Sequence, residues 1–408
     1  MRAGWETVRL ADVCTFRPPK SEARKRLAET DIVSFAPMED LGVNQKYLKP
    51  SGVRPLGSVA GSYTYFADGD VLLAKITPCF ENGKLGIAHD LQNGVGFGSS
   101  EYFVIRPSSR VTAEYLYYFL SQPSFREAGA QSMTGAVGHK RVAKDFLEEH
   151  ALPLPPPAEQ QSIVAILDEA FAGIATARVA AEQNRQNARA LLERHLQSVF
   201  SQRGEGWSEA PLSSMCDIKH GFAFKSEFFT SDGEYVLLTP GNFYESGGYR
   251  DRGEKQKYYC GEVPPGFVLG QGDLLVAMTE QAAGLLGSSI LVPSSGKYLH
   301  NQRLGLVTGK AGVAWSNEFF FHVFNTPAVR KAIHDSASGV KVRHTSPGKI
   351  GQVLVAFPQS IDEQKAIVAQ LESLQKETQS LEALYQRKLE ALDELKRSLL
   401  HQAFSGEL

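Results

Sequence analysis

The sequence contains few cysteines and no long apolar run. Its 408 residues include four cysteines, Cys14, Cys79, Cys216 and Cys260, which lie far apart and form no Cys-x-x-Cys pair. No run approaches the ~20 apolar residues that span a bilayer, and the start MRAGWETVRL lacks the apolar stretch of a secretory signal. These absences predict a cytoplasmic protein with reduced thiols and no membrane segment.

The chain also lacks a large excess of positive or negative charge. The formal net charge is −2, from 43 Lys and Arg against 45 Asp and Glu. The long helical segments carry the acidic excess, while the rest of the chain is nearly neutral. A protein that binds polyanions with its whole surface would be basic. Any binding to DNA must therefore come from local basic faces, and we expect it to need partner proteins.

Motifs for catalysis are absent as well. The chain has no G-x-x-x-x-G-K-[ST] phosphate loop, no Asn-Pro-Pro-Tyr or Asp-Pro-Pro-Tyr of an amino-methyltransferase, and no His-Glu-x-x-His. Its ten histidines show no spacing typical of a metal site. The glycines of NGVGFG at residues 93–98 stand between two strand-like runs and open no helix, so they indicate a turn. We predict no catalytic residue, no metal and no cofactor.

A long internal repeat is present instead. The stretch PAEQQSIVAILDEAF at residues 157–171 resembles IDEQKAIVAQLESL at residues 361–374, half the chain length further on. The match extends to the ends of both helical segments and, with small slips, back to Gly4-Trp5 and Gly206-Trp207. A period of this length is too long for a solenoid unit. It predicts two similar halves in tandem, related by a pseudo-two-fold axis.

The end of each half reads as one long helix, over residues 158–202 and 358–408. Apolar positions follow a 4-3-4-3 seam from Ile163 to Leu191 and from Ile367 to Leu399. About 40 residues give a helix roughly 60 Å long. The first seam is rich in alanine and the second in leucine, which favours antiparallel pairing of the two helices within one chain. A coiled coil between chains is the alternative.

Residues 1–157 and 203–357 read as mixed α/β. Strand-like runs begin at Asp70, Glu101, Glu234, Asp273 and Arg303, and helical stretches follow at residues 112–131 and 316–336. The order of elements is the same in both halves, while the loops differ. Two recognition modules for two different targets would look like this.

The loops carry clusters of Lys and Arg with interspersed Asn and Gln. Lys and Arg bind phosphates, while Arg grips guanine and Asn or Gln grips adenine by paired hydrogen bonds. A solvated surface is the alternative for each cluster. The candidate DNA-binding residues are Arg17, Lys20, Lys25, Asn82, Lys84, Lys140, Arg141, Lys144, Arg250, Arg252, Lys255, Lys257, Asn301, Gln302, Arg303, Lys341, Arg343 and His344.

With these residues, the chain resembles the specificity subunit of type I restriction–modification systems. The resemblance rests on DVLLAKITPCFENGK at residues 70–84, LPLPPPAEQQSIVAILD at 152–168, FPQSIDEQKAIVAQLE at 357–372 and the ending LLHQAFSGEL. It implies an α+β protein with two target recognition domains, residues 1–157 and 203–357, separated by two antiparallel coiled-coil helices. At the site of KITPCFENGK the second half has MTEQAAGLLG, so Asn82 and Lys84 have no counterpart there.

The resemblance also implies a function in phage defence by DNA methylation and restriction. Each domain would read one half of a bipartite duplex DNA target, and the helices would set the unread spacer. The subunit would have no catalysis of its own. It would assemble with two adenine-methyltransferase subunits, and with two restriction subunits in the cleaving complex. Two alternatives stay open, a coiled-coil scaffold that never touches DNA and an enzyme that combines methyltransferase, nuclease and recognition parts.

Overall fold

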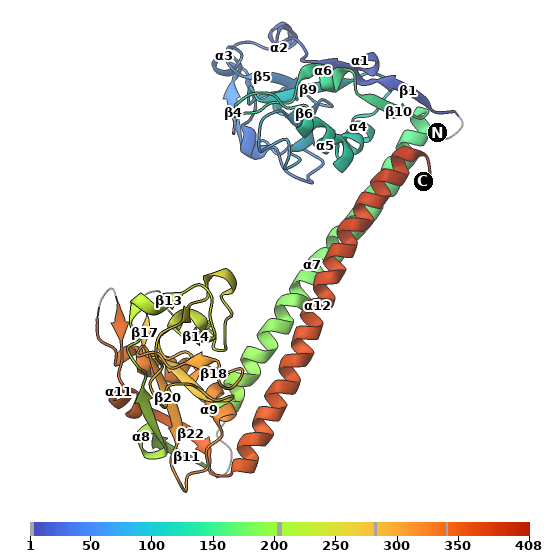
Figure 1. Cartoon of the computed structure of the whole chain (residues 1–408). Coiled ribbons are helices and arrows are strands. Elements are labelled where there is room, and N and C mark those ends of the chain that lie inside the picture. Colours follow the sequence, from blue (N-terminus) through green and yellow to red (C-terminus); the bar gives the residue numbers. More distant parts are fainter. Residues whose placement is uncertain (1–3, 137, 202–205, 281–283, 340–341) are drawn as a thin grey trace. The chain divides into compact units, whose positions relative to one another are not determined.

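The computed structural model describes residues 4–136, 138–201, 206–280, 284–339 and 342–408. The chain forms two compact units (Figure 1). The first comprises Met1–Gln183 and Tyr385–Leu408, and the second comprises Asn184–Leu384. Each unit therefore contains a mixed α/β body and a part of each long helix. The predicted division at residues 157, 202 and 357 stays a prediction.

The first unit contains three sheets. A four-stranded antiparallel sheet has the order β2-β9-β6-β7, a second has the order β4-β3-β8-β5, and β1 pairs with β10. Its elements are β1 (Glu6–Arg9), α1 (Leu10–Val13), β2 (Cys14–Phe16), α2 (Ser21–Arg26), β3 (Ile32–Ala36), β4 (Gly52–Pro55), α3 (Leu56–Val59), β5 (Thr64–Ala67), β6 (Val71–Ala74), β7 (Leu85–Ile87), β8 (Val95–Gly98), β9 (Tyr102–Pro107), α4 (Ala113–Leu120), α5 (Pro123–Gln131), α6 (Lys144–Glu148) and β10 (Ala151–Leu154).

The second unit repeats this plan. The sheet β12-β20-β16-β18 matches β2-β9-β6-β7 strand for strand, and the pair β11-β22 matches β1-β10. Its elements are β11 (Trp207–Pro211), α8 (Leu212–Met215), β12 (Cys216–His220), β13 (Phe229–Thr230), β14 (Tyr235–Leu237), β15 (Tyr258–Tyr259), β16 (Leu274–Ala277), β17 (Thr279–Glu280), β18 (Ser289–Leu291), β19 (Tyr298–Leu299), β20 (Leu304–Gly309), α9 (Asn317–Phe324), α10 (Pro327–Asp335), β21 (Arg343–His344), α11 (Pro347–Gly351) and β22 (Leu354–Pro358). The predicted repeat of the fold is confirmed.

The two halves differ most in the other four-stranded sheet. Both copies have a parallel pair, β3 with β8 and β14 with β19, and both add an antiparallel neighbour, β4 or β15. The fourth strand joins on opposite edges, because β5 pairs with β8 whereas β13 pairs with β15. The variable loops of the sequence thus belong to this more divergent sheet.

Each helical stretch that follows the strands is divided in two. The breaks fall before Pro123 and Pro327, which occupy the first turn of α5 and α10. Proline is tolerated there because the first N–H groups of a helix have no helical partner. Thr112 and Ser316 cap the preceding helices α4 and α9 through their hydroxyls. The sequence predicted the helical stretches but not the breaks.

The two long helices are α7 (Pro157–Ser201) and α12 (Ile361–Ser405). They pack antiparallel in each unit. In the first unit Ile163 and Leu167 share a core with Leu400 and Phe404, and Arg178 pairs with Asp393. In the second unit Arg189 pairs with Glu382. The predicted antiparallel helix pair within one chain is confirmed.

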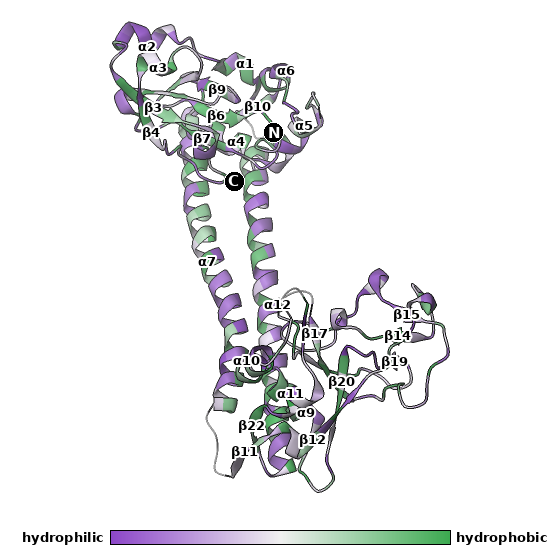
Figure 2. Cartoon of the chain, turned by 90° about the vertical axis from the view of Figure 1, so that its left-hand side faces the viewer, coloured by the Kyte–Doolittle hydropathy of each residue, from purple (hydrophilic) through white to green (hydrophobic). Residues whose placement is uncertain are grey.

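The buried face of these helices departs from the predicted seam. Both helices alternate apolar and polar bands (Figure 2), but the buried positions recur every eleven residues. In α12 Thr378, Leu389 and Leu400 are buried, while the seam positions Lys388 and Leu395 are exposed. A straight α-helix drifts by about 20° for each heptad, so a strict heptad seam turns away from its partner. The 4-3-4-3 expectation is therefore confirmed from Ile163 to Ala181 and from Ile367 to Thr378, and it fails at several positions further along each helix.

The start of each long helix is tied to its own α/β body by a buried glutamine. The Gln160 carboxamide donates from Nε2 to the carbonyls of Arg110 (2.8 Å) and Pro155 (2.9 Å) and accepts from the Thr112 N–H (2.9 Å). Gln364 makes the same three bonds in the second unit, with Ala314, Pro358 and Ser316. The repeated Glu-Gln motif is therefore an anchor between helix and body.

No helix in the described residues is long and apolar enough to cross a membrane.

Candidate nucleic-acid interface

Charged residues gather at one end of the sheet β2-β9-β6-β7. Strand β9 is antiparallel to both β2 and β6, and β7 is antiparallel to β6. The residues that follow β2 and β6 and those that precede β9 and β7 therefore meet at the same sheet end. These residues are Arg17, Lys75, Glu101 and Lys84. Arg17 lies in the left-handed region of backbone space, with φ of 56°.

The segment with Lys140 and Arg141 lies along this sheet end. Its backbone continues the pairing, because the Thr77 N–H donates to the Lys140 carbonyl (3.0 Å) and the Val142 N–H donates to the Lys75 carbonyl (2.9 Å). Arg141 grips Glu101 with two bonds, from Nε to Oε2 (2.9 Å) and from Nη2 to Oε1 (2.8 Å). We call Arg17, Lys75, Glu101, Lys140 and Arg141 the sheet-end cluster.

The sheet-end cluster is basic overall. The Arg141 hydrogen bonds hold the pKa of the Glu101 carboxyl below its usual range, with Lys75 adding to the effect. Burial lowers the pKa of the Lys75 amine, and repulsion from Arg17 and Arg141 lowers it further. Arg141 and Lys75 flank the Glu101 carboxylate, and Arg17 and Lys140 add two further cations at this sheet end. A nucleic-acid phosphate, which is anionic, or the acceptor atoms of a base edge would be attracted to this end of the sheet.

The other predicted residues of the first half have different neighbours. Lys20 donates to the carbonyls of Ala60 and Gly61 (both 3.1 Å). Lys84 donates to the carbonyl of Met38 (2.7 Å), and Lys144 pairs with Glu148 along helix α6. Lys25 on helix α2 and Asn82 are exposed. The structure thus brings Arg17, Lys140 and Arg141 together and leaves Lys25 on a separate helix.

Sequence reasoning missed Lys75 and Glu101. Both residues stand directly at the ends of strand-like runs that the sequence showed. The rule that antiparallel neighbours bring the end of one strand beside the start of the next could have paired them.

The matching sheet end of the second unit carries different side chains. There β17 pairs with β21, with Thr279 opposite His344 and Glu280 opposite Arg343. The Met278 N–H donates to the Arg303 carbonyl (2.9 Å), as the Lys75 N–H does to the Glu101 carbonyl (3.0 Å). Arg303 therefore occupies the place of Glu101, and Met278 occupies the place of Lys75. One frame thus presents two different sets of side chains.

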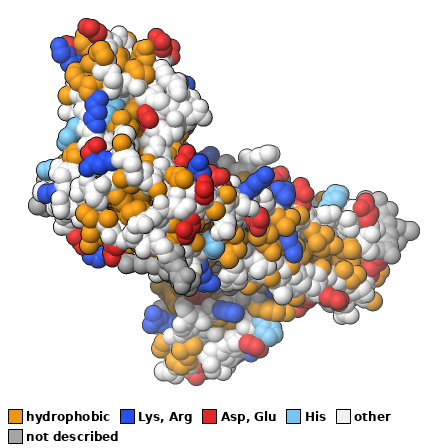
Figure 3. All heavy atoms as spheres, turned by 90° about the horizontal axis from the view of Figure 1, so that it is seen from below, with side chains coloured by type: hydrophobic (Ala, Val, Ile, Leu, Met, Phe, Trp, Pro, Cys, Tyr) orange, Lys and Arg blue, Asp and Glu red, His pale blue; other side chains and the backbone are white. Residues whose placement is uncertain are grey.

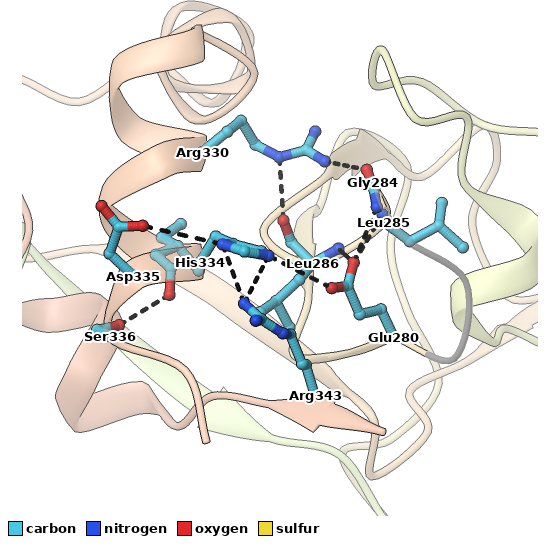
Figure 4. Close-up of polar contacts among 10 residues, drawn as sticks. Glu280, Gly284, Leu285, Leu286, Arg330, His334, Asp335, Ser336 and Arg343 are labelled. Carbon is cyan, nitrogen blue, oxygen red and sulfur yellow. Dashed lines mark hydrogen bonds and ion pairs between the residues drawn. The ribbon is translucent and has the colours of Figure 1, made fainter. Parts of the chain in front are cut away.

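A buried carboxylate organises this second sheet end (Figure 4). Glu280 is 5% exposed, and its Oε2 accepts from the N–H groups of Gly284 (3.1 Å), Leu285 (3.1 Å) and Leu286 (2.9 Å). Arg330 donates from Nε to the Leu286 carbonyl (3.0 Å) and also contacts Gly284. The segment from Gly284 to Leu286 is thus held by Glu280 through its N–H groups and by Arg330 through its carbonyls.

The same view shows Arg343 beside the His334 ring (Figure 4). Its Nη1 lies 2.7 Å from Nε2 and 3.1 Å from Nδ1 of that ring. His334 in turn faces the Glu280 carboxylate at 3.9 Å. Arg343 is half-buried, and its neighbour His344 is exposed. Lys341, also predicted for this site, lies outside the described residues.

Most of the remaining predicted residues of the second half are exposed, while Asn301 is buried and stabilises a turn. Arg250, Lys255, Lys257 and Gln302 are exposed and Arg252 is half-buried. Arg250 lies over the Tyr244 ring at 5.9 Å, and Tyr244 is itself 50% exposed. Asn301 is 6% exposed, and its Oδ1 accepts from the Arg303 N–H (3.0 Å). Asn301 therefore shapes the turn that carries Gln302 and Arg303.

Positive side chains are spread over the surface in the view of Figure 3. On the face shown, Lys and Arg lie among acidic and apolar side chains without forming one continuous field. This fits the formal net charge of −2. The described residues also include no group of three or more His, Cys, Asp or Glu that could hold a metal ion.

Comparison with known proteins found a family that matches part of the chain. Residues 2–182 match the family described as "Type I restriction modification DNA specificity domain". The first half of the chain, which carries the sheet-end cluster, is thus similar to the DNA specificity domains of this family. The resemblance to type I specificity subunits that the sequence predicted is confirmed.

Particular relatives show how far the likeness extends. The chain is 40% identical over 162 residues to the type I restriction enzyme EcoEI specificity subunit of Escherichia coli, and this match covers 40% of the chain and 27% of that subunit. The chain thus spans about a quarter of the length of this curated relative.

Two solved structures have the same fold over the whole chain. One, described as the structural basis of complex assembly and conformational transition of the type I R-M system, has a TM-score of 0.76 at 18% identity and covers 100% of this chain and 99% of its own. The crystal structure of the HsdS subunit from Thermoanaerobacter tengcongensis has a TM-score of 0.70 at 18% identity, with 100% and 98% covered. The fold therefore extends to the second half.

Proposed function

We propose that the chain is the DNA sequence-recognition subunit of a type I restriction–modification complex. The observation that carries the proposal is the repeated sheet end with exchanged side chains. Lys75, Glu101 and Arg141 stand in one half where Met278, Arg303 and His344 stand in the other. Two readers of two different DNA sequences need a common frame and different contact groups.

In this proposal each half reads one part of a bipartite duplex DNA target. Residues 1–157 and 203–357 are the target recognition domains, and the predicted basic residues around both sheet ends are their DNA contacts. The helix pair sets the unread spacer between the two half-sites. The charged side chains of α7 and α12 and the buried anchors Gln160 and Gln364 keep this pair fixed to both domains.

The chemistry is assigned to partner subunits. Two adenine-methyltransferase subunits dock on this chain, and two restriction subunits join the complex when it cleaves DNA. The near-neutral charge supports this division, because about six to ten phosphate contacts are typical of tight binding to duplex DNA and demand local positive charge. The partner subunits supply the remaining phosphate contacts.

The test is co-expression of the chain with a methyltransferase encoded beside its gene, followed by sequencing of methylated adenines. The expected result is one split motif, with two defined half-sites and an undefined spacer. The purified chain alone should bind duplex DNA weakly and methylate nothing. Methyl transfer by the isolated chain, or a co-expressed complex without any sequence motif, would refute the proposal.

A further inference from the structure

The guanidinium of Arg141 is held at three points before any ligand arrives. Nε and Nη2 donate to the two carboxylate oxygens of Glu101, at 2.9 and 2.8 Å. Nη1 donates to the His139 carbonyl at 3.1 Å. An arginine side chain has four rotatable bonds, and ordering them normally reduces affinity. Arg141 has already lost that freedom in the free protein.

Two N–H groups of this guanidinium remain for a ligand. The group has five N–H donors in a planar fork, and Glu101 and His139 accept from three of them. Within the part of the chain that the structure describes, one N–H on Nη1 and one on Nη2 have no acceptor. The Arg141 side chain is 46% exposed. The free donors lie on the two adjacent Nη nitrogens of this partly exposed side chain, and they form a parallel pair when the His139 carbonyl takes the Nη1 hydrogen on the Cδ side.

The groups that hold the Arg141 side chain are themselves fixed by neighbouring residues. The Glu101 side chain is only 23% exposed, and Lys75 lies 3.9 Å from its Oε2. Lys75 is fixed by donating to the Ser100 carbonyl at 2.8 Å. Backbone hydrogen bonds from Thr77 and Val142 attach the Arg141 segment to the sheet. The orientation of the fork is therefore set by rigid elements.

Two parallel donors in a fixed plane match the guanine edge in the major groove, where O6 and N7 are adjacent acceptors. A phosphate would accept the same fork, but it needs no fixed orientation, and the exposed Lys140 beside Arg141 can serve it. We infer that Arg141 reads one guanine of the half-site recognised by the first half of the chain, and that Glu101 is its positioning residue. This inference rests on the proposed function.

The second half lacks this arrangement. At the matching sheet end Arg303 takes the place of Glu101 and Met278 takes the place of Lys75. The side chain of His344 stands where Arg141 stands in the first half. Loss of the fork should therefore alter one base position in one half-site and leave the other half-site unchanged.

The experiment uses the full chain in complex with its methyltransferase partner. Methylation sequencing first gives the motif, and duplexes of that motif are then made with single guanines replaced by 7-deazaguanine, which keeps O6 and lacks N7. Wild type should lose roughly tenfold in affinity at one guanine, as expected for one hydrogen bond to a charged donor. A half-site without guanine would overturn the inference.

Two variants distinguish the paired hydrogen-bond donors of Arg141 from its positive charge. Arg141→Lys keeps the charge but not the fork, so it should lose discrimination at that position by about 5- to 150-fold and no longer respond to 7-deazaguanine. Glu101→Gln should reduce the same discrimination while Arg141 is retained. The matched control is Arg110→Lys, because Arg110 forms a similar exposed pair with Glu6 (2.5 Å) outside the cluster. Its motif should equal that of wild type.

The outcomes distinguish the inference from the proposed function. No motif in the wild-type complex refutes both. A clear motif that Arg141→Lys leaves unchanged refutes the inference alone. Uniformly weaker binding with a salt dependence reduced by about one phosphate also refutes it, because a phosphate contact behaves in this way. Thermal unfolding of each variant shows whether it folds, and a change of one base preference cannot come from lost stability.

Discussion

A buried glutamine at the start of each long helix joins the helix to its α/β body through three hydrogen bonds. Gln160 and Gln364 are both fully buried, and each satisfies three backbone groups that would otherwise be buried without partners. Removing one partner of a buried hydrogen bond costs more than the bond itself contributes, because the remaining group stays desolvated.

Gln160→Ala should therefore lower the free energy of unfolding by about 1–3 kcal/mol. Gln364→Ala should have an effect of the same size in the second unit. The matched control is Gln161→Ala, since Gln161 is exposed on the next residue of the same helix, and it should change stability by no more than about 0.5 kcal/mol. Urea unfolding followed by circular dichroism measures all three. Equal effects of Gln160→Ala and Gln161→Ala would contradict the anchor role.

Two histidines make the second unit sensitive to acid. Burial lowers the pKa of His300 to about 4 and that of His322 to about 4, from an ordinary value of 6.5. His300 is fully buried, and its Nε2 lies 2.9 Å from the Leu304 carbonyl. Because the unfolded state binds protons more readily than the folded state, stability falls as the pH falls from about 6.5 to about 4.

His322→Tyr should remove part of this acid sensitivity, because Tyr118 occupies the matching position of the first unit. Urea unfolding at pH 7.5, 6.0 and 5.0 can follow the fluorescence of Trp207 and Trp315, which belong to the second unit. Wild type should lose about 2 kcal/mol per histidine across this range, and the variant should lose less. The control His89→Gln, at an exposed residue, should behave as wild type. A variant with the full wild-type pH dependence would argue against this origin.

The sequence predicted some residues of the site and missed others. Arg17, Lys140 and Arg141 stood out because lysine and arginine runs are visible locally. Glu101 stayed hidden because a lone acidic residue before a strand has no local signature. Its role depends on Arg141, forty positions further along the chain, and only strand pairing brings the two together. The repeat and the long helices were visible because they depend on periodic patterns within the sequence itself.

At the scale of elements, the helix pair is governed by an eleven-residue period. In α7 the positions Ile174, Arg185 and Leu196 of one series are at least half-buried, and α12 has the series Thr378, Leu389 and Leu400. Eleven residues make three turns at 3.67 residues per turn. The heptad pattern visible in the sequence matches the buried face from Ile163 to Ala181 and from Ile367 to Thr378, and further along each helix the buried face drifts away from it because the helix is straight.

This period predicts which insertions the helix pair accepts. The stretches 173–183 and 388–398 face each other, because Arg178 pairs with Asp393. Two extra copies of each, placed after Gln183 and before Lys388, add 22 residues per helix. They lengthen the pair by about 33 Å at 1.5 Å per residue, close to one turn of DNA at about 34–36 Å. Methylation sequencing should show both half-sites unchanged and a spacer longer by about ten base pairs.

One copy of each stretch provides the matched control. It adds about 16 Å, or roughly half a turn of DNA, so it should fold equally well by circular dichroism but lose methylation. An active 22-residue variant that keeps the original spacer would rule out the proposed role of the helices in setting the spacer.

At the scale of the whole molecule, each unit has its own apolar cores. The main core of the second unit unites Leu274, Val307 and Phe319 with Val368 of α12. The main core of the first unit unites Val71, Ile105 and Tyr115 with Ile163 of α7 and Phe404 of α12. Each α/β body is therefore stabilised by contacts within its own unit.

Exchange of one body should accordingly change one half of the target. Replacement of residues 203–357 by the matching segment of a relative with another specificity should alter one half-site in the methylation map. The other half-site and the spacer should be preserved, since residues 1–157 and both helices are kept. The reciprocal exchange of residues 1–157 is the control and should alter the opposite half-site. A swap that changes both half-sites would show that the two bodies do not read independently.

The first unit is assembled from both ends of the chain, and this has a consequence for the order in which the protein folds during synthesis. Leu400, Ala403 and Phe404 complete the core that contains Leu10 and Tyr115, yet the ribosome adds them long after these two residues. At about 5–20 residues per second, the first body waits for this part of its core for tens of seconds. The second unit, Asn184–Leu384, is contiguous and can close earlier. A nascent chain therefore carries an open apolar surface on the first body until residues 400–404 have been made.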